Sequence, residues 1–428
     1  MNYLQQAHAA WANHSARRAR RQRYKRYTYG DQWSDIVHDR HGRAISEAQL
    51  IRRSGQIPLS NNLIRRMIKA IIGQYRTGVD QQQPYDNLDP RLTCLNDLAE
   101  MDSRMLEEFL ISGCAIQRVS NDVRPSGSGV WIDNVSPDRF FVEDFRDPRG
   151  TDITLLGMLH DMTPGEVISR FSHGDRARGR RIADHYGAID DDPLWLEGKD
   201  AGDFFTAPRG RWRVIECWQL VPADTGDANN MSLQFKWHCR WLTPKGYVLS
   251  EYDSPWSHGS HPFVLKFYPL TDGEVHSFVE DVIKQQHYIN RVIVLMDKML
   301  DSSAKGVLLF PVGQKPSNVT WEDIANNWAS PDGIIPITDR TSHLPQQINS
   351  TAGDVGAHRL LEMQLKLFED TSGVSSTLLG NTSSIPANGG SALFEAQLRQ
   401  ANASLADLMA TFTAWRRDRD LKASMLLT

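Results

Sequence analysis

Apolar side chains recur at steps of three and four residues in several parts of the chain, a spacing that places them on one face of an α-helix. This pattern predicts helices near 61–73, 92–113, 164–186, 277–303, 354–370 and 391–415. The strongest start signal is Thr163-Pro164-Gly165-Glu166, in which threonine caps the helix, proline fits its first position and glutamate completes a capping box. We expect the helix that begins there to run to about Tyr186.

Short runs rich in β-branched and aromatic residues, separated by glycine and proline, predict strands. A hairpin is expected from 114–120 and 130–135. A second, tryptophan-rich group of predicted strands lies near 212–220, 232–242, 246–252 and 263–268. The stretch before it, 187–210, is polar and rich in glycine, aspartate and proline, so we expect a loop followed by a separate β-rich subdomain. The chain is therefore expected to be α+β.

The composition is that of a folded and nearly neutral protein. The chain has 428 residues, of which 40% are hydrophobic, and its 48 basic and 52 acidic residues give a net charge of −4. This balance excludes wholesale disorder and a histone-like basic protein, although it allows a local basic patch. No apolar run approaches the roughly 20 residues that span a bilayer. The N-terminus does not resemble a secretory signal, and the four widely spaced cysteines are expected to be reduced thiols.

The strongest local charge lies near the N-terminus. Residues 1–30 contain no acidic residue and seven basic ones, namely Arg17, Arg18, Arg20, Arg21, Arg23, Lys25 and Arg26. We interpret this basic arm either as a contact to nucleic-acid phosphates or as a solvated helix or mobile terminus. Three interleaved tyrosines would allow base stacking, and equally would allow packing onto a neighbouring subunit.

The sequence contains no strong catalytic motif. It lacks a Gly-x4-Gly-Lys-Ser/Thr phosphate loop, an HExxH zinc motif and a Gly-x-Ser-x-Gly nucleophile elbow. The best candidate is a cluster that could bind a divalent cation for phosphodiester hydrolysis: Asp190, Asp191, Asp192, Glu197 and Lys199. The cluster falls on one flexible loop, which cannot hold metal ligands in fixed geometry, so we favour a solvated acidic loop. His258 and His261 are expected at the surface, and we expect no metal, no cofactor and no enzymatic activity.

Six segments, in one order along 29–415, carry a family resemblance. They are Tyr29-Gly30-Asp31-Gln32-Trp33; Pro58-Leu59-Ser60-Asn61-Asn62-Leu63-Ile64 with Ile72-Gly73; Val135-Ser136-Pro137-Asp138-Arg139-Phe140-Phe141-Val142-Glu143-Asp144; Gly246-Tyr247-Val248-Leu249; His261-Pro262-Phe263-Val264; and Asp281-Val282-Ile283-Lys284-Gln285-Gln286-His287-Tyr288-Ile289-Asn290-Arg291. In these segments the chain resembles the bacteriophage portal proteins, the head-to-tail connectors, particularly those of short-tailed phages. The chain is shorter than such portals, and its arginine-rich start is heavier.

The resemblance implies an α+β portal fold, with a helical wing and two long stem helices that flank a β-rich clip. The segments that it implies on this chain are an N-terminal wing with the basic arm (1–162), a first stem helix (163–189), the clip (190–276), a second stem helix (277–303), a tunnel-loop region (304–353), a further wing segment (354–390) and a C-terminal helix that starts a short crown (391–428).

The same resemblance implies a structural ring, usually of twelve subunits, at one capsid vertex of the virion, assembled in the host cytoplasm. Double-stranded DNA would enter and leave non-specifically through its channel. The terminase large subunit would dock during packaging and tail adaptors afterwards, capsid and scaffolding proteins would be further partners, and no membrane would be involved. Two alternatives stay open: a metal-dependent nuclease built on 190–199, and a nucleic-acid-binding scaffold that uses 17–26.

Two further expectations concern single residues. A channel must let DNA slide, so its wall needs few fixed cations. The predicted helix 277–303 has nearly balanced charges, and its Lys284, Arg291 and Lys298 are candidates for cationic rings in the channel. In the last helix the apolar residues recur in heptads, which fits either one helix packed in a bundle or contact between subunits. Phe412 and Trp415 are the candidate anchors of a subunit interface.

Overall fold

The computed structural model describes residues 3–427 except 83–84, 86–87, 125–126, 191–203, 224–234, 306, 330–333, 339–344, 349–351 and 375–390. The chain divides into two compact units, unit 1 (Met1–Lys25, Met67–Asp281 and Thr377–Thr428) and unit 2 (Arg26–Arg66 and Val282–Ser376). Three helices contain residues of both units: α2 (Ser15–Thr28), α4 (Leu63–Gln82) and α10 (Phe278–Lys305). Each unit therefore combines segments that are far apart in the sequence.

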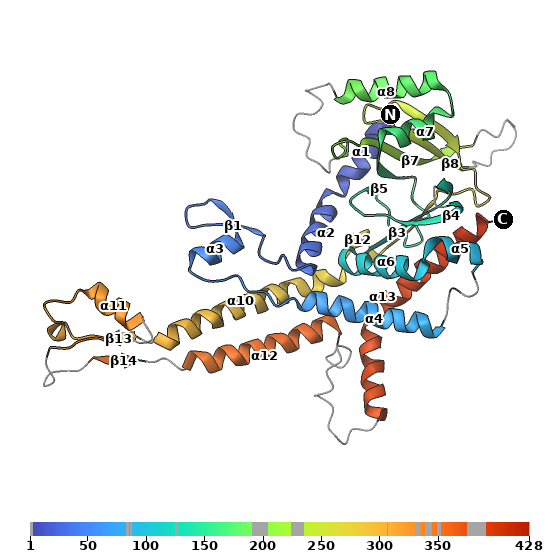
Figure 1. Ribbon diagram of the computed structural model, residues 1–428. Helices are drawn as coiled ribbons and strands as arrows, with labels where there is room; N and C mark the ends of the chain where they lie inside the picture. Colours follow the sequence, from blue (N-terminus) through green and yellow to red (C-terminus); the bar gives the residue numbers. More distant parts are fainter. Residues whose placement is uncertain are drawn as a thin grey trace. The chain divides into compact units, whose positions relative to one another are not determined.

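Unit 1 contains a five-stranded antiparallel sheet in the order β5-β6-β7-β8-β9; β5, β7 and β8 are labelled in Figure 1. Its strands are β5 (Phe140–Val142), β6 (Leu155–Met162), β7 (Trp212–Pro222), β8 (Phe235–Leu242) and β9 (Val248–Asp253). Successive side chains of a strand point to opposite faces of a sheet, and β7 shows how both faces are covered. Ile215 and Cys217 join an apolar core with helix α1 (Tyr3–Asn13). Val214 and Trp218 join a second core with helices α7 (Pro164–Ser172) and α8 (Arg176–Asp190).

A second sheet of unit 1 has three antiparallel strands in the order β10-β3-β4. They are β3 (Cys114–Arg124), β4 (Gly127–Asn134) and β10 (Phe263–Phe267), followed by the short pair β11 (Pro269–Thr271) and β12 (Glu274–Val275). Three helices pack against this sheet: α5 (Pro90–Asn96), α6 (Leu98–Ser112) and α13 (Ser391–Met425). Gly113 links α6 to β3 with φ 72°, and a Cβ there would lie 2.9 Å from Cγ1 of Val275, so this tight turn requires glycine.

Unit 2 consists of helices and short strand pairs around α10. Its other elements are β1 (Ile36–His38), β2 (Ala44–Ser46), α3 (Glu47–Arg53), β13 (Val307–Leu309), the 3-10 helix η1 (Val312–Gln314), α11 (Trp321–Ala329), β14 (Gln346–Ile348) and α12 (Ala352–Ser372). Strands β13 and β14 pair antiparallel. Along the chain α10 leads into the segment with β13, α11 and β14, and α12 follows it (Figure 1).

The mixture of helices and sheets agrees with the α+β expectation, and the hairpin at 114–135 is present as β3 and β4. All four cysteines are free thiols. None of the helices in the described ranges is both long and apolar enough to cross a membrane.

The expectation of one continuous helix at 163–189 is wrong. Thr163 caps α7 with the expected capping box, but the helix ends at Ser172 and α8 begins at Arg176. Between them His173 and Gly174 adopt φ angles of 51° and 81°, the left-handed conformation that terminates a helix. Apolar residues of both helices pack on the five-stranded sheet.

The β-rich segment 190–276 is not a separate subdomain. Its strand β7 pairs with β6 along the whole length of β6, and its strand β10 pairs with β3. The predicted boundary at 190 therefore divides a single sheet. Tryptophan-rich runs show that strands are present, but they do not show which strands pair, because pairing partners lie far apart in the sequence.

Candidate nucleic-acid interface

The three channel candidates lie on one exposed face of α10. Lys284, Arg291 and Lys298 are all exposed. They are seven residues apart, and seven residues make almost two full turns of an α-helix. Each cation therefore lies about 10 Å further along the helix than the one before, and only about 20° around the axis from it. The helix therefore brings the three cations into one column.

The three cations of this column differ in their surroundings. The guanidinium of Arg291 pairs with the buried carboxylate of Glu47, with Nη2 3.0 Å and Nε 3.1 Å from Oε1. Neither Lys284 nor Lys298 has an ion pair or hydrogen bond with the residues that the structure describes. Glu47 thus offsets the central charge, while no carboxylate of the described residues pairs with the two outer ammonium groups.

The opposite side of α10 is held by buried amide side chains. Gln286 and Asn290 are one turn apart and fully buried. Gln286 donates to the carbonyl of Asn61 at 2.6 Å and accepts from the amides of Leu63 and Ile64 at 2.9 and 3.3 Å. Asn290 accepts from the amide of Asn61 at 3.1 Å. The two side chains therefore satisfy the first backbone groups of α4, which the start of a helix leaves without partners.

The network continues through Gln32. Asn290 donates to Oε1 of Gln32 at 2.5 Å, and Gln32 donates to the carbonyl of Tyr27 at 2.9 Å and to Oδ1 of Asn62 at 3.2 Å. Asn62 in turn donates to the carbonyl of Thr28 at 2.9 Å. Three of the six segments that carry the family resemblance thus meet in one hydrogen-bonded network, which we call the amide network (Gln32, Asn61, Asn62, Gln286 and Asn290); Gln32, Gln286 and Asn290 are its buried members. Spacing along the chain gave no signal of this meeting.

A second set of contacts lies beside the amide network. The imidazole of His287 lies between the hydroxyl of Tyr27, at 3.2 Å, and the carboxylate of Glu47, at 3.3 Å. The indole of Trp33 contacts the same imidazole in a tilted arrangement, 5.7 Å between ring centroids, and it donates to the carbonyl of Leu59 at 3.1 Å. Glu47 therefore binds both His287 and Arg291, which are one turn apart on α10.

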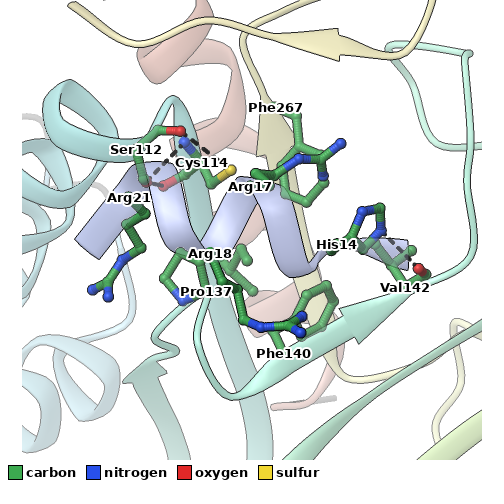
Figure 2. A pocket seen from close by; sticks show the side chains of 11 residues that line it. His14, Arg17, Arg18, Arg21, Ser112, Cys114, Pro137, Phe140, Val142 and Phe267 are labelled. Atoms are coloured by element: carbon green, nitrogen blue, oxygen red, sulfur yellow. Dashed lines mark hydrogen bonds between the residues drawn. The ribbon is translucent and has the colours of Figure 1, made fainter. Parts of the chain in front are cut away.

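The basic arm forms part of α2, and several of its arginines are used inside the protein (Figure 2). Arg21 is almost fully buried and donates to both oxygens of Glu108 at 2.7 Å, and it also pairs with Asp138. Arg18 donates to the carbonyl of Trp11 at 2.5 Å, with its guanidinium 3.5 Å from the centre of the Trp11 ring. These two cations are not available to phosphates. For Arg18 and Arg21 the interpretation as a nucleic-acid contact is therefore wrong.

The remaining arginines of the arm are held more loosely. Arg17 lies over the ring of Phe267 at 5.0 Å, a cation–π contact. Two arginines form ion pairs, Arg20 with Glu280 at 3.6 Å and Arg26 with Asp35 at 3.2 Å. Arg23 and Lys25 are exposed. The arm is therefore a packed helix rather than a mobile terminus.

A small cavity of about 20 Å³ lies beside the arginines of α2 (Figure 2). The Nε2 of His14 donates to the carbonyl of Val142 at 2.9 Å, and burial, reinforced by the charge of Arg17, lowers the pKa of this imidazole to about 4. Burial raises the pKa of the Cys114 thiol to about 12. At neutral pH the cavity therefore holds a neutral imidazole and a protonated thiol, and it has room for about one water molecule rather than for a nucleotide.

The other candidate sites gain no support. Asp191, Asp192, Glu197 and Lys199 lie outside the described residues, as does the side chain of Asp190. His261 is only partly exposed, and burial lowers its pKa well below the usual range. Among the residues that the structure describes, no three His, Cys, Asp or Glu side chains are grouped to hold a metal ion.

Phe412 and Trp415 are core residues rather than subunit anchors. Both are almost completely buried within the single chain, and the indole of Trp415 donates to the carbonyl of Val264 at 3.3 Å. One turn further, the buried Arg419 pairs with the buried Asp102. Of the two interpretations of the heptad spacing, the structure favours packing within the chain, because this face of α13 packs on β3 and β10 of unit 1.

Sequence reasoning missed a set of exposed apolar side chains. Most of the large apolar residues that are exposed in the described part of the chain belong to unit 2: Tyr29, Ile36, Leu50, Ile57, Leu59, Tyr288, Leu295, Leu300, Leu309, Val312, Trp321, Ile334, Ile337, Met363 and Leu367. Exposed apolar groups are therefore more frequent in the described part of unit 2 than in that of unit 1.

Comparison with known proteins gives one family. A model of the phage P22-like portal protein family matches residues 96–419, which is more than half of the chain. No curated protein matches.

The amide network should contribute strongly to stability. Replacing Asn290 with leucine leaves Oε1 of the buried Gln32 without its donor and Nε2 of the buried Gln286 without one of its acceptors, so we expect the free energy of unfolding to fall by about 3 kcal/mol. Denaturant unfolding of the purified protein measures this loss. Lys284→Leu, on the exposed side of the same helix, is the control and should change it by less than about 0.5 kcal/mol. Equal effects of the two variants would contradict the network's role.

His14 should make stability depend on pH. Its pKa is about 4 in the folded protein and 6.5 in the unfolded chain, so protons bind the unfolded state preferentially as the pH falls through this window. Between pH 7 and pH 5 the wild type should lose about 2 kcal/mol more unfolding free energy than His14→Gln, whose amide retains a donor for Val142. Unfolding curves at the two pH values test this. Identical pH dependence of the two proteins would show that His14 is not buried as a neutral group.

Proposed function

The chain belongs to the P22-like family of phage portal proteins, and from this premise we propose that its copies form the closed ring at one capsid vertex through which double-stranded DNA enters and leaves. As a portal protein it is a structural component of the head–tail connector and takes part in DNA packaging. Beyond this family role, we propose which residues form the wall of the DNA channel and which surfaces bind other proteins. Twelve copies are the number that the family resemblance favours.

The column of cations on α10 is the observation that carries the channel proposal. A protein that neutralises six to ten phosphates binds DNA tightly, whereas a channel must let DNA pass. Here only Lys284 and Lys298 present unpaired charges, because Glu47 offsets the charge of Arg291. Repeated around a ring, they would form two separated cationic rings about 20 Å apart along the helix. Such a wall attracts the duplex without gripping it at every phosphate.

The order of elements supports a revised assignment of stem and clip. The resemblance implies two long helices that flank a β-containing segment, and in unit 2 the helices α10 and α12 flank the segment with β13, η1, α11 and β14. We therefore place the stem in α10 and α12, and the clip in 306–351, instead of the earlier assignment to 163–189, 190–276 and 277–303. By the same order α13 begins the crown.

The proposed clip carries exposed apolar side chains suited to docking. Val312 is 79% exposed, Trp321 47% and Ile334 83%. Exposed aromatic and aliphatic groups of this kind anchor protein interfaces. We infer that this surface meets the terminase large subunit during packaging and the tail adaptors afterwards, while capsid and scaffolding proteins contact other parts of the ring.

The two alternative functions receive less support. A nucleic-acid-binding scaffold needs available cations in 17–26, and Arg18 and Arg21 are committed to partners within the chain. A nuclease needs a fixed set of metal ligands, and the candidate ligands Asp191, Asp192 and Glu197 lie outside the described residues. The family is structural, and the geometry adds no reason to depart from that role.

Charge reversal in the column tests the channel. The variant Lys284→Glu/Lys298→Glu should still form rings, because both side chains are exposed, but its rings should package DNA more slowly and to a shorter length, because two acidic rings repel the duplex. Packaged DNA length and rate in an assay with proheads and terminase measure the effect. Lys69→Glu, an exposed reversal on α4, is the control. Normal packaging by the double variant would place the column away from the DNA.

A further inference from the structure

The exposed face of α10 carries a second column beside the cations. Tyr288 and Leu295 are also seven residues apart, and they are 43% and 49% exposed. At about 100° per residue, this apolar column is turned by about 40° from the column of Lys284, Arg291 and Lys298. One face of α10 therefore presents two parallel columns, one apolar and one cationic.

Helix α12 exposes a matching pair of apolar residues. Met363 and Leu367 are one turn apart and are 52% and 44% exposed, while Phe368 is buried on another side of the helix. Charged residues of both signs share the exposed arc with this pair, namely Arg359, Glu362, Lys366 and Asp370. An apolar centre with a polar rim is the usual composition of a protein interface.

We propose that Tyr288 and Leu295 of one copy pack against Met363 and Leu367 of a second copy, so that α10 and α12 form the seam between neighbours in the ring. The inference rests on the proposed function and names the contact that closes it. A closed ring of more than two copies needs two different complementary surfaces on each subunit. Unit 2 offers them on two different helices, and the family to which the chain belongs assembles rings.

The seam also explains how one helix serves two surfaces. The cationic column is turned by only about 40° from the apolar column and so lies at the edge of the seam, where the long side chains of Lys284 and Lys298 can extend past the neighbouring helix. The amide network on the opposite side holds both columns in a fixed direction. A rotation of α10 about its axis would bury charge in the seam and expose apolar residues in the channel.

Cross-linking between differently tagged copies tests the seam directly. Two single-cysteine variants, Leu295→Cys and Met363→Cys, are made in a Cys94→Ser background, because Cys94 is the exposed native cysteine and the other three are buried. When the two variants assemble together and are oxidised, we expect a disulfide-linked heterodimer. The linkage joins separate chains by design, so a contact within one chain cannot produce it. Neither variant alone should form the dimer.

A pair of glutamate variants measures the contribution of the seam to assembly. Leu295→Glu should raise the protein concentration for half-maximal ring formation on the order of tenfold. Leu300→Glu is the matched control, because Leu300 is 52% exposed on the same helix but about 140° away from the apolar column, and its assembly should equal that of the wild type. Normal rings without the heterodimer, or equal effects of the two glutamates, would overturn the seam and leave the portal function standing. Absence of rings from the wild type would overturn both.

Discussion

The buried hydrogen bonds of Gln286 and Asn290 fix the rotation of α10, and the surfaces of unit 2 depend on that rotation. Both amides are fully buried, and each bonds to segments more than two hundred residues earlier in the sequence. Apolar packing alone tolerates small rotations and shifts of a helix, whereas a buried amide loses its partners if the helix turns. The network therefore specifies which side chains of α10 face outward.

The buried N-terminal arginines, like the buried amides of α10, fix a helix through specific partners. A run of seven cations suggests a nucleic-acid ligand, but Arg21 is neutralised by Glu108 and Asp138, and Arg18 stacks on Trp11. Buried guanidinium groups need such partners, because leaving a charge without them inside the protein is costly. The arm thereby fastens α2 to the rest of unit 1, and Arg18 and Arg21 add nothing to a DNA-binding surface.

Local sequence patterns predicted the elements better than their assembly. The capping box at Thr163, the hairpin at 114–135 and the long helix from about 277 were all recognisable, because each depends on neighbours in the sequence. The break at His173-Gly174 was missed because the apolar spacing continues on its far side. The pairing of β6 with β7, the burial of Trp415 and the meeting of Gln32 with Asn290 depend on contacts between distant segments, which spacing does not record. For the candidate site, the heptad positions of Lys284, Arg291 and Lys298 were visible, but the partner of Arg291 was not.

The central claim is that copies of this chain close around an axis, with the cationic column of α10 toward the lumen. Electron cryomicroscopy of the assembled wild-type protein tests it most directly. The account predicts a closed ring with a central hole, in which Lys284 and Lys298 of every copy face the lumen and Gln286 and Asn290 remain buried within each subunit. Monomers or dimers alone at high concentration, or a ring whose lumen is lined by other segments, would contradict it.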